Sequence, residues 1–436
     1  MHIKTGKQTI RVLIFAAVPV FILLSITFVS AQEGEGTPRS GIRPDAPPYG
    51  VRGLYSVGTK EFVIEDNQGT LMGTVWYPAL NPDNTEELNV YAYDMGPDMP
   101  PLTIEGHAIL DAAINGEQGP YPLVIYSHGL GGSRWSSLYL TEHLASYGFI
   151  VMAVDHSGDN FLLENTPEMI IDSYATRPND VRRLIAYADS LVLPGGQFEG
   201  ALDVQIIGLT GVSFGGYTTV ASAGARFNFG GLAAWCAENA GTALDPDPSA
   251  VAVPYPILPF STAGACFIGQ HQERLAELRG LESFPEGLWE SFSDPRVAAA
   301  VPIVPWNAPL FNEAGLAALT VPVMVIDGTA DVITPPERDA YRFFEYFGSD
   351  NKVLVMLENA GHLSVLNDCS AWPWLGAMAY SFCSDPVWDM DRAHDLINHF
   401  TTAFLLATLK GDTDAAAALA PDVVSFPGIT YETTGF

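Results

Sequence analysis

Basic residues are scarce in this 436-residue chain, which has 20 Lys and Arg against 50 Asp and Glu and a formal charge of −30 at neutral pH. A surface of this charge repels a phosphate backbone, which argues against nucleic acid as a partner and favours solubility in an extracellular, salty setting. Phosphate-loop signatures are missing too, because the glycine-rich segment SHGLGG has neither a complete G-x-G-x-x-G nor a P-loop lysine.

Cysteine is also rare, with four residues in the whole chain: Cys236, Cys266, Cys369 and Cys383. No two of them have C-x-x-C spacing, which argues against a zinc site. In an exported protein an even number indicates two disulfides, and the local pairs Cys236 with Cys266 and Cys369 with Cys383 are the simplest of the three connectivities. Buried free thiols are the alternative.

The first residues have the pattern of an export signal. Lys4, Lys7 and Arg11 precede an apolar run from Val12 to Val29, and the small residues up to Ala31 suit signal-peptidase cleavage. We expect a signal peptide over residues 1–31 and a secreted mature protein, extracellular or periplasmic, without stable membrane insertion. The run is long enough to span a bilayer, so anchoring by an uncleaved N-terminal helix is the alternative.

A flexible linker rich in Gly, Pro and charge is predicted over residues 32–49, followed by a folded domain over residues 50–436. Two β-like segments joined by a turn predict an antiparallel hairpin over residues 60–77. From Tyr121 onward short apolar runs alternate with helix-period segments, which predicts an α/β fold with a mainly parallel, doubly wound sheet. The predicted strands of this part are 123–126, 149–154, 204–209, 297–304, 321–326 and 352–357.

Two helices have clear periodicity. One is expected to start after Pro178, and the other runs from Asp391 to Lys410 and should close the sheet. Residues 226–294 break the βα rhythm and contain two of the cysteines. We interpret this stretch as an inserted cap or lid whose apolar, Pro-rich piece from Val251 rims a substrate cleft. Packing of the insertion against the core is the alternative.

Residues 211–216, Gly-Val-Ser-Phe-Gly-Gly, lie between a buried strand and an Ala-rich helix. G-x-S-x-G occurs by chance, but in this context it forms a sharp turn that pushes the serine hydroxyl out at the carboxyl end of the strand. Ser213 is therefore the candidate nucleophile.

A serine hydroxyl needs a base, and the base needs an orienting carboxylate. Asp327 and Asp331 follow the fifth predicted parallel strand, and His362 follows the sixth. The chain order of serine, aspartate and histidine, each on a loop after a strand, suits a catalytic triad. We favour Asp331 over Asp327 because it lies further along the loop, where its side chain can reach His362. Among the other histidines, His143 is expected on a helix surface.

The tetrahedral intermediate of acyl transfer needs two N–H donors for its oxyanion. The first candidate is the amide of Phe214, directly after the nucleophile. The second is the amide of Leu130, in the glycine-rich loop that follows the strand 123–126. This chemistry requires neither a metal nor an organic cofactor.

The chain resembles bacterial dienelactone-hydrolase-related esterases, similar to plasma-type platelet-activating factor acetylhydrolases and, more distantly, to cutinase-like polyester hydrolases. The resemblance is carried by YPLVIYSHGLGG, LASYGFIVMAVDH, TRPNDVRRLI, GVSFGGYTTV, DPRVAAAVPIVPW and IDGTADVITP. It implies an α/β-hydrolase fold, with Ser213, Asp331 and His362 as the triad and the Leu130 and Phe214 amides as the oxyanion hole.

The resemblance also implies a substrate-lining role for Trp306, since a Pro-Trp follows the corresponding strand in the cutinase-like enzymes; a core tryptophan is the alternative. Two departures from the cutinase pattern argue against an open, polymer-accepting cleft: Val212 replaces a histidine, and the chain has a long insertion. We expect a secreted esterase acting on small-molecule, lipid-like, short-acyl or polyester-type esters. A serine amidase or peptidase and a non-catalytic binding protein on the same fold are the alternatives.

Overall fold

A computed structural model describes residues 45–95, 100–163, 166–239, 262–372 and 380–436, which all belong to one compact unit. The predicted signal peptide and residues 32–44 of the predicted linker lie outside the described residues and stay predictions. The last linker residue, Tyr49, already packs on the fold, since its carbonyl oxygen accepts a hydrogen bond from His143 Nε2 at 2.8 Å. Among the described helices, none combines the length and the apolar character that crossing a membrane requires.

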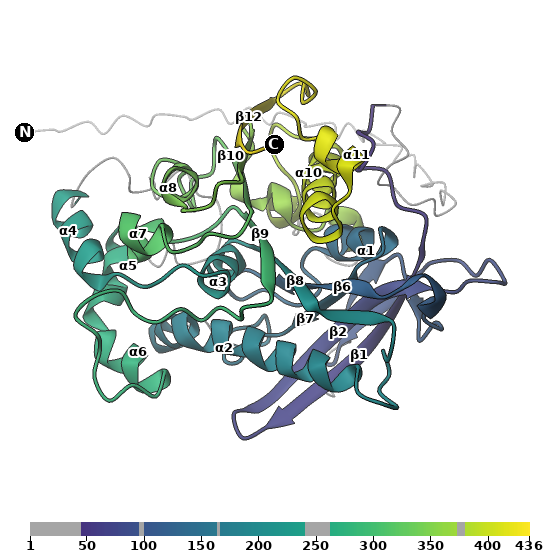
Figure 1. Cartoon of the computed structure of the whole chain (residues 1–436), viewed down its shortest axis with the longest axis horizontal. Helices are drawn as coiled ribbons and strands as arrows, with labels where there is room; N and C mark the ends of the chain where they lie inside the picture. Colours follow the sequence, from purple (N-terminus) through teal and green to yellow (C-terminus); the bar gives the residue numbers. More distant parts are fainter. Residues whose placement is uncertain (1–44, 96–99, 164–165, 240–261, 373–379) are drawn as a thin grey trace, which may run out of the picture. The chain divides into compact units, whose positions relative to one another are not determined.

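The chain alternates between strands and helices (Figure 1). The strands are β1 (Ser56–Asp66), β2 (Gly69–Ala79), β3 (Asn89–Tyr93), β4 (Leu102–Gly106), β5 (Ile109–Leu110), β6 (Tyr121–Ser127), β7 (Ile150–Val154), β8 (Leu202–Val212), β9 (Val297–Ile303), β10 (Val323–Gly328), β11 (Lys352–Leu357) and β12 (Ile429–Thr434). The α-helices are α1 (Leu138–Ser146), α2 (Pro167–Leu191), α3 (Phe214–Ser222), α4 (Phe229–Asn239), α5 (Thr262–Phe267), α6 (Gln272–Leu278), α7 (Ala308–Leu316), α8 (Ala340–Tyr346), α9 (Tyr380–Cys383), α10 (Met390–Lys410) and α11 (Thr413–Ala417). Short 3-10 helices are η1 (Gly116–Gln118), η3 (Ile268–Gln270), η4 (His362–Val365) and η5 (Cys369–Ala371).

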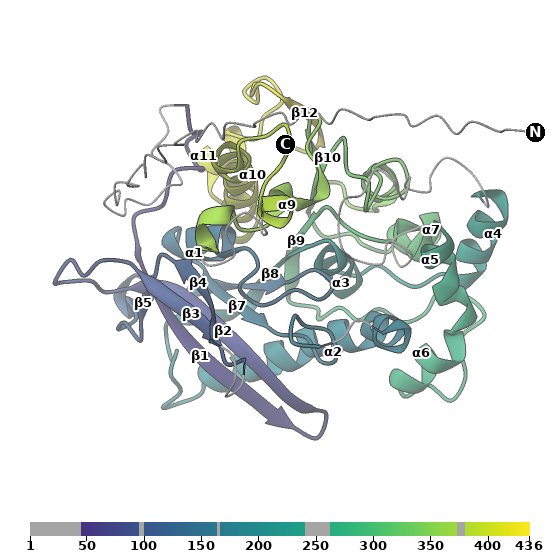
Figure 2. The ribbon, with the colours of Figure 1, turned by 180° about the vertical axis from the view of Figure 1, so that it is seen from behind.

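The main sheet has the strand order β12-β11-β10-β9-β8-β6-β7-β2-β1-β5. Strands β6 to β11 are mutually parallel and correspond to the six strands predicted from apolar runs. Every residue of β6, β7 and β10 is buried, as expected for parallel strands covered on both faces. The predicted hairpin is present as β1 and β2, whose antiparallel pair extends the sheet beyond β7 (Figure 2). The predicted α/β fold with a mainly parallel sheet and an N-terminal antiparallel hairpin is confirmed.

Helices cover both faces of the sheet and enclose two hydrophobic cores. Helices α1 and α10 contribute to one core, and α2, α3 and α7 contribute to the other. Figures 1 and 2 show α10 and α2 on opposite sides of the sheet. This three-layer arrangement leaves the carboxyl ends of the parallel strands as the edge where loops can gather.

The strand order reverses direction at β6. The chain passes from β6 to β7 on one side, then returns to place β8 on the other side of β6. In open α/β sheets ligands bind at such a switch point, beyond the carboxyl ends of the strands. The register pairs Ser127 with Gly211, so the loop after β6 and the turn at Ser213 emerge side by side there.

Helix α2 differs from its prediction, because it begins at Pro167 and contains Pro178 in its interior. Proline lacks the N–H that would bond to the carbonyl group four residues earlier, which belongs to Tyr174. Here the hydroxyl of Tyr217 donates to that carbonyl oxygen at 2.6 Å. A side chain from α3 therefore replaces the missing backbone donor and lets the helix continue through the proline.

Helix α10 has the predicted bounds within one residue and ends at Gly411, which has a left-handed φ of 65°. The prediction that this helix closes the sheet is wrong. It lies on one face of the sheet, and the edge is covered instead by β12, which pairs antiparallel with β11.

The described parts of the insertion, residues 226–239 and 262–294, contain α4, α5 and α6 and pack on the main body. Leu232, Leu275 and Trp289 belong to one of the two hydrophobic cores, and the Asn228 amide donates to the carbonyl oxygen of Leu310 in α7 at 3.0 Å. The Pro-rich piece from Val251, on which the lid interpretation depends, lies outside the described residues. The lid stays a prediction.

Candidate active site

Ser213 lies in a strained turn between β8 and α3. Its φ of 57° and ψ of −118° are uncommon for a residue with a side chain. The turn is so tight that a Cβ on Gly215 would collide with the carbonyl oxygen of Ser127. The predicted glycines are thus required by close backbone packing, and Ser213 is held at the carboxyl edge of the sheet.

His362 and Asp331 form a buried pair on the loops after β11 and β10. His362 Nδ1 lies 2.6 Å from Asp331 Oδ2. The other carboxylate oxygen accepts hydrogen bonds from the amides of Ile333 and Thr334, both at 2.8 Å, and the Thr334 hydroxyl donates to Oδ2 at 2.8 Å. Burial would raise the pKa of Asp331, but the charge of His362 and these hydrogen bonds outweigh it and lower the pKa. Asp331 is therefore held as a carboxylate that orients the imidazole.

Asp327 has a different environment, although it is only four residues away. Its carboxyl is buried, and among the described residues its Oδ2 has no hydrogen-bond partner. Burial, followed by the negative charge of Asp331, raises the pKa of Asp327 well above its ordinary value. The structure thus places Asp331 and not Asp327 against His362, as the sequence indicated.

A short chain of contacts links this pair to Ser213. The Ser213 amide donates to the carbonyl oxygen of Ile303, at the end of β9, at 2.9 Å. The next carbonyl oxygen, of Val304, lies 3.3 Å from Thr334 Oγ1. Since Thr334 also donates to Asp331, the carboxyl end of β9 connects the serine turn to the Asp–His pair. The sequence did not lead us to Thr334 as a partner of Asp331. Its position three residues after Asp331, from which a hydroxyl can reach the carboxylate, is the pattern that could have indicated it.

The two predicted oxyanion donors also lie at this edge. Within the described parts of the chain, neither the Leu130 amide nor the Phe214 amide donates to a protein acceptor. Gly129, which precedes Leu130, abuts the nucleophile, because a Cβ there would lie 3.4 Å from the Ser213 Cβ. Both amides are therefore available next to the serine.

A second Ser-His-Asp set lies behind this loop. Ser127 Oγ is 2.7 Å from His156 Nε2, and His156 Nδ1 is 3.2 Å from Asp180 Oδ2. Their exposed fractions are 2%, 1% and 2%. A nucleophile must reach its substrate, so this buried set has a structural role.

Trp306 is 2% exposed and belongs to a hydrophobic core. Its indole Nε1 donates to the Tyr174 hydroxyl at 2.5 Å, and its ring lies 4.6 Å from the Arg338 guanidinium carbon. This burial favours a core tryptophan over the substrate-lining role that the resemblance implies.

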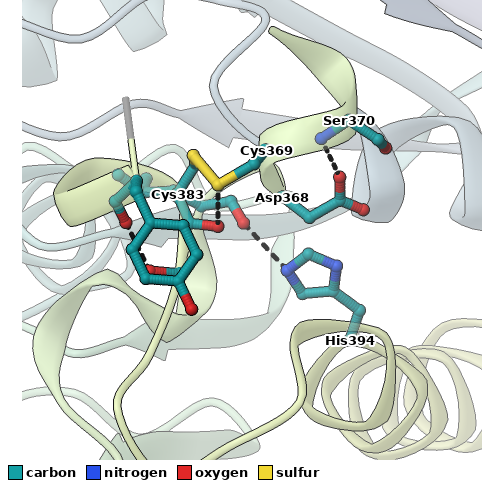
Figure 3. The surroundings of a disulfide bond; sticks show 8 residues. Asp368, Cys369, Ser370, Cys383 and His394 are labelled. Atoms are coloured by element: carbon teal, nitrogen blue, oxygen red, sulfur yellow. Dashed lines mark hydrogen bonds between the residues drawn. A yellow bond between two sulfur atoms is a disulfide. The ribbon is translucent and has the colours of Figure 1, made fainter. Parts of the chain in front are cut away.

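Both predicted disulfides are present, Cys236–Cys266 in the insertion and Cys369–Cys383 after the His362 loop. The second joins η5 to α9, and Figure 3 shows His394 of α10 pointing toward the segment that carries it. His394 Nε2 lies 2.8 Å from the Leu366 carbonyl oxygen. The segment after His362 is thus held in place by the Cys369–Cys383 disulfide and by the hydrogen bond from α10.

Comparison with known proteins gives matches on both sides of Ser213. Residues 104–163, which include the Leu130 loop, match a family described as platelet-activating factor acetylhydrolase, isoform II. Residues 286–382, which include Asp331 and His362, match a family described as PET hydrolase-like. A platelet-activating factor acetylhydrolase from dog, Canis lupus familiaris, is 29% identical over 134 residues.

The match to the dog protein covers 27% of this chain and 30% of that relative. It is therefore a partial similarity. The two family matches, which cover other parts of the chain as well, and the mainly parallel sheet support the same relationship. The resemblance inferred from the sequence is confirmed: this chain has an α/β-hydrolase fold and is similar to the platelet-activating factor acetylhydrolase and PET hydrolase-like families of ester hydrolases.

Proposed function

We propose that this protein is an exported serine esterase that hydrolyses carboxylic esters through an acyl-enzyme on Ser213. The observation that carries the proposal is the buried 2.6 Å contact between His362 and Asp331, which Thr334 and the end of β9 link to the strained serine turn. A base oriented by a carboxylate next to an otherwise weak nucleophile is the arrangement that acyl transfer requires.

The reaction has two halves. His362 takes the proton of the Ser213 hydroxyl as its oxygen attacks the ester carbonyl carbon, and the amides of Leu130 and Phe214 bind the resulting oxyanion. The carbon–oxygen bond to the alcohol then breaks, and the alcohol leaves with the proton from His362. Water, activated by His362, attacks the acyl-enzyme in the same way and releases the acid.

The substrate class follows from the similarities and from the insertion. The matched families are described as platelet-activating factor acetylhydrolase, isoform II, and as PET hydrolase-like, so we propose lipid-like, short-acyl or polyester-type esters. The predicted cap and Val212 before the serine favour small or single-chain esters over a polymer. Export is proposed from the predicted N-terminal signal peptide and fits two disulfides, which persist in oxidising compartments.

The proposal is tested by initial rates on p-nitrophenyl esters from acetate to palmitate, with wild type, Ser213→Ala and Ser222→Ala. Ser222 is a matched control, because it lies on α3 and its buried hydroxyl has no hydrogen-bond partner in the described parts of the chain. We expect preference for short acyl chains, loss of activity in Ser213→Ala and retention in Ser222→Ala. Preference for long chains would indicate a lipase with a mobile lid.

Two further assays separate the alternatives. Matched ester and anilide substrates distinguish an esterase from an amidase, since only the leaving group differs. A serine-reactive phosphonate should label Ser213 covalently, whereas a binding protein should not be labelled. Inactivity of the wild type on every ester, without labelling, would refute the proposal.

A further inference from the structure

Arg177 of α2 and Asp159 form an ion pair that is entirely buried. Arg177 Nε lies 2.6 Å from Asp159 Oδ2, and both side chains are 0% exposed. Removing two charges from water is costly, and such pairs contribute little net stability compared with apolar residues. Because the pair itself adds little stability, its role is better judged from the hydrogen bonds that Arg177 and Asp159 make to other groups.

Those bonds end on the backbone of the loop after β6. Arg177 Nη1 donates to the His128 carbonyl oxygen at 2.6 Å, and Nη2 donates to the Gly129 carbonyl oxygen at 2.9 Å. Asp159 Oδ1 accepts a hydrogen bond from the Gly131 amide at 2.7 Å. One ion pair thus fixes backbone groups on both sides of Leu130.

The Gly129 carbonyl and the Leu130 amide belong to the same peptide group. In a trans peptide the C=O and N–H bonds point in opposite directions. Since Arg177 holds the oxygen on one side, the Leu130 N–H is turned to the other side, and a Cβ on Gly129 would lie 3.4 Å from Ser213 Cβ. Rotation of this single peptide would remove one of the two oxyanion donors.

His128 strengthens the same orientation. Its Nε2 accepts a hydrogen bond from the His156 amide at 3.1 Å, which leaves the proton of the neutral ring on Nδ1. Nδ1 lies 2.7 Å from the Gly129 carbonyl oxygen and donates to it. Burial, followed by the charge of Arg177, lowers the pKa of His128 to about 3, so the ring stays neutral and keeps this tautomer.

Arg177 also packs against the side chain of Phe214, the residue whose amide is the other proposed donor, because its guanidinium carbon lies 4.8 Å from the Phe214 ring centroid. We propose that Arg177, together with Asp159, is a positioning residue that orients the Gly129–Leu130 peptide toward the oxyanion. This inference rests on the proposed function, and it names residues that act through the loop without touching the substrate.

The test uses Arg177→Met, Arg177→Lys and the double variant Arg177→Met/Asp159→Asn, which removes the pair without leaving a buried charge. Arg182→Met is the matched control, since Arg182 also lies on α2 and donates to two backbone carbonyls, of Phe292 and Ser291, away from this loop. For each variant, kcat and KM are measured on a short-chain p-nitrophenyl ester. The active-site concentration used to calculate kcat is the amount of protein that a phosphonate has labelled when the labelling is complete. The affinity of a trifluoromethyl ketone, which forms a tetrahedral adduct with the serine, is measured in parallel.

We expect kcat of Arg177→Met and of the double variant to fall about 100-fold, which is the loss seen when one oxyanion donor is removed. KM should stay within about twofold, and the ketone affinity should fall in parallel with kcat/KM, because both depend on stabilising the tetrahedral state. Arg177→Lys should recover part of the loss, and Arg182→Met should match wild type.

A merely structural role would lower the number of labelled active sites and leave kcat per site unchanged. Folded Arg177 variants with wild-type kcat and ketone affinity, while Ser213→Ala is inactive, would overturn the inference alone. An active Ser213→Ala would instead overturn the proposed function.

Discussion

Acidification should destabilise this protein through histidines that are buried in the uncharged form, and His143 on α1 is the most direct case. It is 1% exposed, its Nε2 faces the Tyr49 carbonyl oxygen, and within the described residues its Nδ1 has no partner. A proton on Nδ1 would place a buried charge near Arg52 and His399, and burial, the largest cause, lowers the pKa of His143 to about 3. The sequence-based expectation of a surface position is wrong, because the N-terminal segment at Tyr49 covers this face of α1.

The magnitude follows from the difference between the folded and unfolded states. The unfolded chain binds a proton at His143 below about pH 6.5, whereas the folded protein binds it only near pH 3. The stabilisation is therefore complete above pH 6.5 and decreases as the pH falls between these values. At pH 5.0, about 1.5 units below the unfolded pKa, the loss is about 2 kcal/mol, since one pKa unit is worth about 1.4 kcal/mol.

The variant His143→Gln isolates this effect, because the Gln amide can still donate to the Tyr49 carbonyl oxygen but does not titrate. Urea unfolding at pH 7.5 and 5.0 gives the free energy of unfolding for each protein. We expect the loss between these pH values to be smaller by about 2 kcal/mol in the variant. Thr141→Ala, which removes a non-titrating buried hydroxyl from the same helix, should keep the wild-type loss. Equal losses in His143→Gln and wild type would refute the reasoning.

Three other outcomes are expected. Asp331→Asn should lower kcat on p-nitrophenyl esters by about 10⁴-fold. Asp327→Asn, which replaces a carboxyl whose pKa burial raises and whose Oδ2 has no hydrogen-bond partner among the described residues, should stay near wild type in the same assay. Replacing Cys369 and Cys383 by Ser should lower the unfolding free energy by about 3 kcal/mol, because the disulfide spans 14 residues and restricts the unfolded chain by about that amount. Thermal unfolding with and without reductant checks this. Tyr217→Phe leaves a buried helix carbonyl unpaired and should cost about 1–3 kcal/mol in urea unfolding.

The parallel strands and the residues that follow them could be predicted from the sequence, because apolar runs and G-x-S-x-G depend on local patterns. Asp331 could be favoured over Asp327 by its place along one loop, and the structure agrees. The start of α2 could not be predicted, since Pro178 has the pattern of a helix start and the hydroxyl that compensates for it comes from Tyr217, 39 residues further on.

Arg177 and Asp159 were missed for the same reason. In the sequence they are two charged residues on separate segments, and only the fold brings them together under the loop at Leu130. Strand β12 was missed because it is a short strand whose residues alternate between half-buried and exposed, as in many edge strands. Patterns within one element were therefore predictable, and contacts between distant elements were not.

The pairing of β12 with β11 has a consequence for handling the protein. Strand β11 has the sequence KVLVML, which combines high β-propensity with little charge, and β12 covers its backbone donors and acceptors. A chain trimmed after α10 would expose that edge as a template for other chains, directly before the loop that carries His362. We expect such a truncated protein to aggregate. An affinity tag on this side should therefore be joined after Phe436 through a soluble spacer, so that β12 stays paired with β11.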